Sequence, residues 1–127
     1  MVRIVSFVLA LSVVSTPAVA EEIKMSCHTS IDKSLGLGPT VFKYTNPFFG
    51  SRKITVRYKG KWVRWCSPEA GYDKDWEYSV KVTDRYGVCR TKAGKYRHVT
   101  HLDFEAVRRY MDNQHKYGTE AKCRLLR

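Results

Sequence analysis

The sequence predicts a small α+β domain, an antiparallel sheet with one helix near 102–113, held together by disulfides. Three observations predict this fold class. Apolar and polar residues alternate in several short stretches after residue 20, the cysteines form an even set, and the stretch 102–113 changes to helical spacing. The alternative is an all-β small barrel, in which 102–111 forms a further strand.

The first twenty residues are expected to be a signal peptide. Arg3 gives a basic start, the run Ile4–Val14 is apolar, and Ala18–Ala20 has the A-x-A pattern of a cleavage site. The apolar run is too short to span a bilayer. We therefore expect residues 1–20 to be removed, which leaves 21–127 as one compact secreted or periplasmic domain with no transmembrane segment.

The chain is strongly basic. It has 23 Lys and Arg residues against 12 Asp and Glu residues, a formal net charge of +11, which falls to +10 if Arg3 leaves with the signal peptide. Such an excess favours an anionic partner, such as a nucleic acid, an acidic glycan, a membrane surface or an acidic protein. We expect the domain to be a monomer.

The first elements after the leader are expected to be strands. The stretch Ile23–Thr29 alternates between apolar and polar residues and predicts a strand. The glycine-rich stretch Ser34–Pro39 predicts a loop, and Val41–Tyr44 a short strand that ends before Asn46-Pro47.

The clearest element is a β-hairpin. Lys53–Tyr58 and Lys61–Cys66 alternate on either side of a Lys59-Gly60 turn. A two-residue turn would pair Tyr58 with Lys61, Val56 with Val63, and Ile54 with Trp65. The opposite face would then carry Lys53, Thr55, Arg57, Trp62, Arg64 and Cys66. The alternative is a longer turn with a shifted register, because lysine is a poor residue for a positive φ.

A second hairpin is expected to follow. Tyr78–Thr83 and Val88–Thr91 alternate, and Asp84–Gly87 between them suits a type I turn. In this register Cys89 faces the core, whereas Cys66 lies on the outer face of its own hairpin. These two cysteines would meet only if they lie at strand ends.

The stretch Thr100–Asn113 is expected to be the helix, and Ala121–Leu126 the last strand. Thr100–Asp103 is a weak form of the capping box that begins many helices. The helical stripe would consist of Leu102, Phe104, Val107, Tyr110 and Met111.

The four cysteines are Cys27, Cys66, Cys89 and Cys123. An even number in a small exported domain predicts two disulfides, and the absence of a C-x-x-C pair argues against zinc. Three pairings are possible, of which we favour Cys27 with Cys123 and Cys66 with Cys89. The first would close a loop near 100 residues, worth roughly 4 to 5 kcal/mol in the chain-entropy model.

The outer face of the first hairpin is the best candidate for a binding site. Lys53, Arg57 and Arg64 offer positive charge, and Trp62 offers a ring that can stack on a base or a sugar. The plainer interpretation is a solvated strand face, on which a cross-strand pair of Arg57 and Trp62 only stabilises the hairpin.

Two other groups could carry chemistry. His98 and His101, with Asp103, could serve acid–base catalysis or bind a metal, although surface histidines are the commoner explanation. The acidic stretch could serve glycoside hydrolysis or hold calcium, although a solvated loop is commoner. It contains Glu69, Asp73, Asp75 and Glu77. No nucleophile elbow, phosphate loop or dinucleotide fingerprint occurs, and no cofactor is expected.

The layout resembles the small secreted effectors of plant-pathogenic fungi, in particular their ribonuclease-like group. In that group an aromatic residue, any residue and a cysteine begin the mature protein; Met25-Ser26-Cys27 is similar, with Met in place of the aromatic residue, and Cys123 matches the late cysteine. The resemblance implies a non-catalytic binder of RNA or of a host protein that serves virulence.

We therefore expect a secreted, cationic, non-enzymatic binding protein that engages an anionic partner such as RNA, an acidic glycan or an acidic protein. One alternative is a secreted ribonuclease that uses His98 and His101. The other is an exported bacterial small β-barrel that binds or inhibits a partner, similar in outline to the lysozyme-inhibitor type. The inhibitory motif of that type is missing, and a cationic lysozyme would repel this chain.

Overall fold

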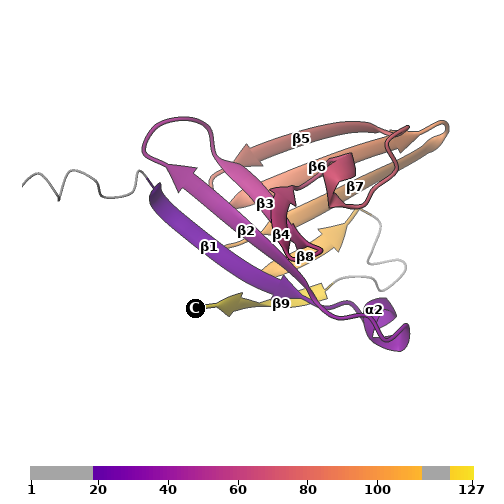
Figure 1. The fold of residues 1–127 in the computed structure, drawn as a ribbon, viewed down its shortest axis with the longest axis horizontal. Helices are drawn as coiled ribbons and strands as arrows, with labels where there is room; N and C mark the ends of the chain where they lie inside the picture. The colour runs from indigo at the N-terminus through magenta and orange to yellow at the C-terminus, as the bar shows by residue number, and fades with distance from the viewer. Residues whose placement is uncertain (1–18, 113–120) are drawn as a thin grey trace, which may run out of the picture.

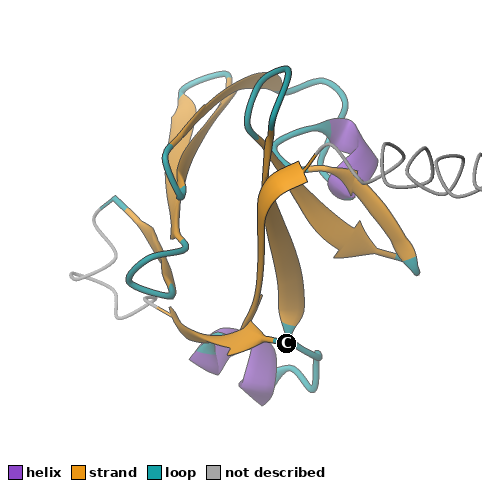
Figure 2. Cartoon of the chain, turned by 90° about the vertical axis from the view of Figure 1, so that its left-hand side faces the viewer, coloured by secondary structure: helices purple, strands orange, loops and turns teal. Residues whose placement is uncertain are grey.

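The computed structural model describes residues 19–112 and 121–127. Its nine strands form one antiparallel sheet in the order β4-β3-β2-β1-β9-β8-β7-β6-β5, which curls into a half-barrel (Figures 1 and 2). The strands are β1 (Val19–Cys27), β2 (Thr40–Pro47), β3 (Lys53–Tyr58), β4 (Lys61–Arg64), β5 (Glu77–Thr83), β6 (Tyr86–Ala93), β7 (Tyr96–Asp103), β8 (Arg108–Met111) and β9 (Ala121–Leu126). Two short helical segments, α2 (Ser30–Ser34) and η2 (Pro68–Ala70), lie in the connections.

The predicted α+β class is therefore wrong, and the architecture agrees with the all-β alternative. The stretch predicted as a helix near 102–113 contains the end of β7, a turn and β8, while its last residue, Asn113, lies outside the described residues. The two strands pair directly, with Leu102 opposite Arg109 and Asp103 opposite Arg108.

The turn between β7 and β8 explains why the helical spacing misled. The Asp103 carboxylate accepts hydrogen bonds from the backbone N–H groups of Glu105, at 3.0 Å, and Ala106, at 2.8 Å. Such local bonds compete with a helix, and Val107, with φ 55°, reverses the chain. Thr100 and Asp103 thus serve a strand and its turn, not a capping box.

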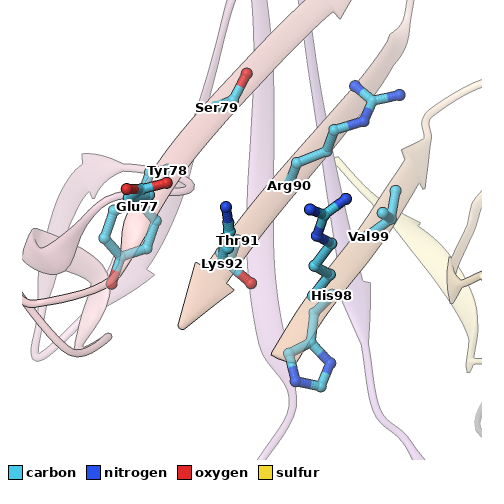
Figure 3. A pocket seen from close by; sticks show the side chains of 9 residues that line it. Glu77, Tyr78, Ser79, Arg90, Thr91, Lys92, His98 and Val99 are labelled. Carbon is cyan, nitrogen blue, oxygen red and sulfur yellow. The ribbon is translucent and has the colours of Figure 1, made fainter. Parts of the chain in front are cut away.

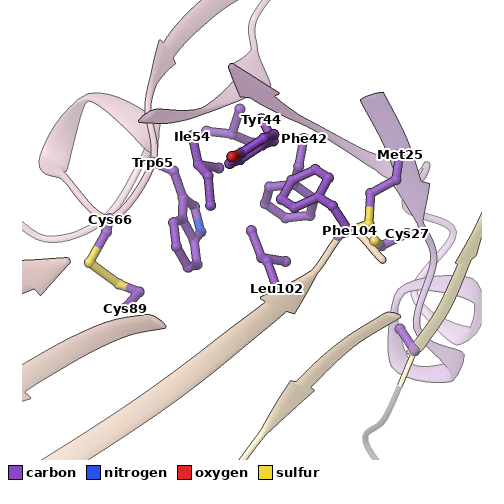
Figure 4. Close-up of a cluster of buried hydrophobic side chains, with 12 residues drawn as sticks. Met25, Cys27, Phe42, Tyr44, Ile54, Trp65, Cys66, Cys89, Leu102 and Phe104 are labelled. Atoms are coloured by element: carbon purple, nitrogen blue, oxygen red, sulfur yellow. A yellow bond between two sulfur atoms is a disulfide. The ribbon is translucent and has the colours of Figure 1, made fainter. Parts of the chain in front are cut away.

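The inner face of the sheet encloses the core (Figure 4). Neighbouring strands contribute their alternate residues, so that the concave side is lined by aromatic and aliphatic side chains. The buried apolar residues are Met25, Cys27, Phe42, Tyr44, Ile54, Val56, Trp65, Cys66, Cys89, Leu102, Phe104 and Ala121.

Gly87 shows how closely the two ends of the sheet approach across this core. A Cβ atom at this position of β6 would lie 2.3 Å from Cδ1 of Ile54 and 3.0 Å from a ring atom of Trp65. The absence of a side chain at Gly87 therefore lets the β3–β4 region pack against β6.

The predicted register of the first hairpin is confirmed. Arg57 lies opposite Trp62 and Tyr58 opposite Lys61. The two turn residues both have left-handed backbones, Lys59 with φ 51° and Gly60 with φ 79°, as a type I′ turn requires. In the second hairpin Thr83 lies opposite Tyr86, so the turn spans 83–86, one residue earlier than the predicted Asp84–Gly87. Arg85 has a left-handed backbone with φ 54°, which a type I turn does not contain, so the predicted turn type is wrong as well.

Both expected disulfides are present, and they have the favoured pairing. Cys27 and Cys123 lie directly opposite each other on β1 and β9, with 4.2 Å between their Cα atoms. Cys66 bonds to Cys89 across the concave side. The conflict of faces disappears because Cys66 lies beyond the end of β4, where its φ of 66° turns the side chain inward.

The short helix α2 follows β1 directly. Thr29 Oγ1 accepts a hydrogen bond from the Asp32 N–H at 3.0 Å, and the Asp32 carboxylate accepts one from the Thr29 N–H at 3.3 Å. This reciprocal cap fixes the start of the helix. Within the described ranges, no helix has the length and apolar character that crossing a membrane requires.

Candidate anion-binding face

The outer side of β1 to β4 carries a set of basic side chains around one tryptophan. We call it the cationic face and define it by Lys24, Lys43, Lys53, Arg57, Trp62 and Arg64. The strand registers assemble it, because residues opposite one another share a face. Lys24 lies opposite Lys43, Lys43 opposite Thr55, and Thr55 opposite Arg64, which gives one row across four strands.

Trp62 lies at the centre of this face. Nζ of Lys43 is 4.4 Å from the ring centroid, the guanidinium carbon of Arg57 is 5.4 Å from it, and Nζ of Lys24 is 5.9 Å from it. The negative face of an indole ring attracts cations at such distances. The ring therefore holds cations from three neighbouring strands close together.

Few carboxylates neutralise these cations. Glu22 lies 3.8 Å from Lys43, and Glu69 of η2 lies 3.7 Å from Arg64. Within residues 19–112 and 121–127, no ion pair involves the other three cations of the face, which are Lys24, Lys53 and Arg57. The Arg64 side chain is 70 % exposed, so its pair with Glu69 is a solvated one of small energy.

The structure thus brings together all four residues that the sequence predicted for binding, namely Lys53, Arg57, Trp62 and Arg64. Sequence reasoning missed Lys24 and Lys43. Each stands between two inward apolar residues of its own strand, which marks it as outward-facing. That they lie beside the hairpin depends on the strand order β3-β2-β1, which local patterns do not contain.

The outer side of β6 to β8 carries a different group, which we call the tyrosine–histidine network: Tyr86, His101, Tyr110 and Asp112. Nδ1 of His101 is hydrogen-bonded to the Tyr86 hydroxyl, and Nε2 lies 2.6 Å from the Asp112 carboxylate. The hydroxyls of Tyr86 and Tyr110 are 3.1 Å apart, and the ring of Tyr110 stacks on His101 with 4.5 Å between centroids.

Every polar group of this network has a partner within it. With Nε2 protonated, His101 donates to Asp112 and accepts from Tyr86, whose oxygen accepts in turn from Tyr110. Burial, the hydrogen bond with Tyr110 and the nearby carboxylates all raise the pKa of Tyr86 above its ordinary value. The folded chain therefore favours the neutral hydroxyl of Tyr86.

His98 does not join His101. The two residues are three positions apart on β7, so their side chains lie on opposite faces of the strand. His98 lies at a hollow of about 500 Å³ over β5 to β7, which Figure 3 shows with its lining side chains. Three of these, Arg90, Lys92 and Arg97, are basic, and Glu77 is the one carboxylate among the lining residues.

The acidic stretch is divided between a helical segment, a turn and a strand. Glu69 is in η2, the Asp73 carboxylate accepts a hydrogen bond from the Asp75 N–H at 2.8 Å, and Glu77 begins β5. In the part of the chain that the structure describes, no group of three or more His, Cys, Asp or Glu residues is placed to hold a metal ion.

Comparison with protein-family models, with curated proteins and with solved structures finds no match to this chain.

Proposed function

We propose that this chain is a small half-barrel protein that captures a linear polyanion, a nucleic acid or an acidic glycan, on its cationic face. It acts by binding and not by catalysis. The all-β architecture favours the small β-barrel binding protein over the α+β effector among the expectations from sequence. The resemblance to fungal effectors and the export of the chain stay predictions.

The observation that carries this proposal is the direct opposition of Lys24 and Lys43 on neighbouring strands. Like charges in this position destabilise a sheet, and Glu22 offsets only part of the cost, since it lies 3.8 Å from Lys43. Together with Arg57 and Arg64, the two lysines leave excess positive charge on one side of the molecule. An anionic partner would offset it.

The layout of the row suits a linear partner. Neighbouring strands are about 4.8 Å apart, so the row from Lys24 to Arg64 extends over about 14 Å. A polyanion lying across the strands would meet several cations in sequence and release its counterions, so binding would weaken steeply as salt rises. Trp62 holds the cations in place, and its own stacking on a base stays a prediction.

Binding is tested by fluorescence anisotropy with two labelled polyanions, a single-stranded RNA oligonucleotide and a heparin fragment, against neutral dextran. Both polyanions should bind and dextran should not. The double variant Arg57→Gln with Arg64→Gln should bind at least tenfold more weakly at low salt. For RNA it should also lower the salt slope by about two units, one for each arginine that no longer neutralises a phosphate.

A matched control is the double variant Arg90→Gln with Arg97→Gln, which removes the same charge from exposed arginines at the hollow over β5 to β7. It should bind like the unmodified protein. Loss of binding in this variant alone would place the site at that hollow and contradict the proposal. Cleavage of the RNA during the experiment would instead favour the ribonuclease.

A further inference from the structure

The loop between β2 and β3 exposes two adjacent phenylalanines at its tip. Phe48 is 64 % exposed and Phe49 is 85 % exposed. Single apolar residues are common on protein surfaces, but two neighbouring aromatic rings at the tip of a loop form a coherent apolar feature. Nothing in the polyanion proposal makes use of them.

Two cations follow the phenylalanines closely in the sequence. Arg52 and Lys53 follow the tip and are exposed, and no acidic residue occurs from Phe48 to Lys53. In the described ranges, neither Arg52 nor Lys53 takes part in an ion pair. Apolar rings at the tip and cations behind them are the arrangement of a segment that enters an anionic lipid interface.

The position of the loop leaves it accessible. It lies at the end of the sheet opposite to α2, as Figure 1 shows. Gly50, with φ 97°, makes the tight turn, and its Cβ position would lie 3.9 Å from Cγ of Pro47. Only glycine adopts this backbone readily, so the tight turn depends on Gly50, and the two phenylalanines that precede it are exposed to solvent.

We infer that this loop inserts into the surface of an anionic bilayer, with Phe48 and Phe49 in the interfacial region and Arg52 and Lys53 against the lipid headgroups. The positive charge decides between possible occupants. A second copy of the chain would bring its own Arg52 and Lys53 to the same place and be repelled, whereas anionic lipids attract them. This inference goes beyond polyanion capture.

The test is sedimentation of the protein with sucrose-loaded vesicles, either of phosphatidylcholine alone or with about one third phosphatidylglycerol, the mixture that supplies the negative surface potential. The protein should sediment with the mixed vesicles and stay in solution with the neutral ones. The double variant Phe48→Ser with Phe49→Ser should lose at least tenfold in vesicle affinity.

A matched control removes two other exposed apolar side chains, Leu35, 66 % exposed, and Leu37, 55 % exposed, which follow α2 directly in the chain. The variant Leu35→Ser with Leu37→Ser should sediment like the unmodified protein. Near-ultraviolet circular dichroism checks that both variants fold, and heparin affinity, which should not change in either, separates this inference from polyanion capture.

Three results would overturn the inference. The first is that the unmodified protein does not sediment with the mixed vesicles. The second is that the Phe48 and Phe49 variant sediments as well as the control. The third is that light scattering finds a dimer that this variant converts to a monomer, since the rings would then cover a second copy.

Discussion

The outer side of this sheet has two halves of opposite character. On β1 to β4, cations converge on Trp62, and three of the five have no ion pair among the described residues. On β6 to β8, His101 bonds to Tyr86 and Asp112 and stacks on Tyr110, so the polar groups satisfy one another. The half on β1 to β4 therefore has positive charge available for a partner, while the polar groups of the half on β6 to β8 bond to one another.

This difference separates two roles that the sequence alone does not separate. Histidines near acidic residues suggest catalysis, yet His101 is enclosed in a complete set of bonds, and its side chain is 14 % exposed. Lysines on strands suggest ordinary solvated surface, yet Lys24 and Lys43 are directly opposed. The cationic face therefore retains positive charge that a partner can use, whereas the polar groups of the tyrosine–histidine network already bond to one another.

The largest effect is expected from His101→Ala. It removes the partner of both Tyr86 and Asp112 and the stacking on Tyr110, so the free energy of unfolding should fall by about 2 kcal/mol. Urea denaturation with the disulfides intact measures it. His98→Ala, at an exposed position without a described partner, should change stability by less than about 0.5 kcal/mol. If His101→Ala kept its stability but lost RNA binding, the half on β6 to β8 would be the binding site, and the roles assigned to the two halves would be wrong.

Trp62→Ala should weaken polyanion binding by about 1 kcal/mol, because the cations of three strands lose the ring that holds them together. The loss should be equal for RNA and for heparin, which has no bases. A loss confined to RNA would show that the ring stacks on a base and would correct this account of Trp62.

Stability should depend on Tyr86 at high pH. Its pKa is raised in the folded chain above the ordinary value of 10.0, so the folded state favours the neutral hydroxyl. This contribution is complete below pH 10.0 and is lost as the pH rises through the folded pKa. Tyr86→Phe should flatten the decline of the unfolding free energy above that pH, whereas Tyr96→Phe, at a 73 % exposed position, should not. If the unfolding free energy declined equally in both variants above pH 10.0, the network would not be what raises the pKa of Tyr86.

The smallest effect is expected from Glu69→Gln. This change removes the carboxylate 3.7 Å from Arg64 and so leaves more positive charge on the cationic face. Because the pair is exposed, polyanion affinity should rise only about twofold at low salt. Weaker binding would mean that Glu69 orients Arg64 for its partner.

Local pattern was sufficient for the first hairpin and not for the helix. Lys53–Tyr58 alternates without interruption and only Lys59-Gly60 separates it from the next strand, so the register and the shared face could be predicted. Lys59 adopts a φ of 51°, which lysine does not favour, so the turn residues alone would not have given this register. At 102–113 the apolar residues that fit one helical stripe belong to three different parts of the fold, namely the end of β7, the turn and β8. The hydrogen bonds that Asp103 accepts from Glu105 and Ala106 hold the turn between the strands, and apolar spacing does not reveal them.

The candidate site could be predicted only where it lies within one hairpin. Arg57 and Trp62 are neighbours because of a two-residue turn, whereas Lys24 and Lys43 reach Trp62 through the order of three strands. The tyrosine–histidine network was missed because the stretch that contains Tyr110 and Asp112 was predicted as a helix, whereas Tyr110 lies on β8 directly opposite His101 of β7. Both groups lie on strands that follow one another in the chain, so predicting either group requires each of those strands to be identified and paired correctly.

The most direct test of the account is an amide chemical-shift titration of the isotope-labelled protein with a heparin fragment. The account predicts that shifts gather on the cationic face, at Lys24, Lys43, Arg57 and Arg64, and fade as salt is added. His101 and Tyr86 should stay unchanged. Shifts that gather on β6 to β8, or around the hollow at Arg90 and His98, would contradict it.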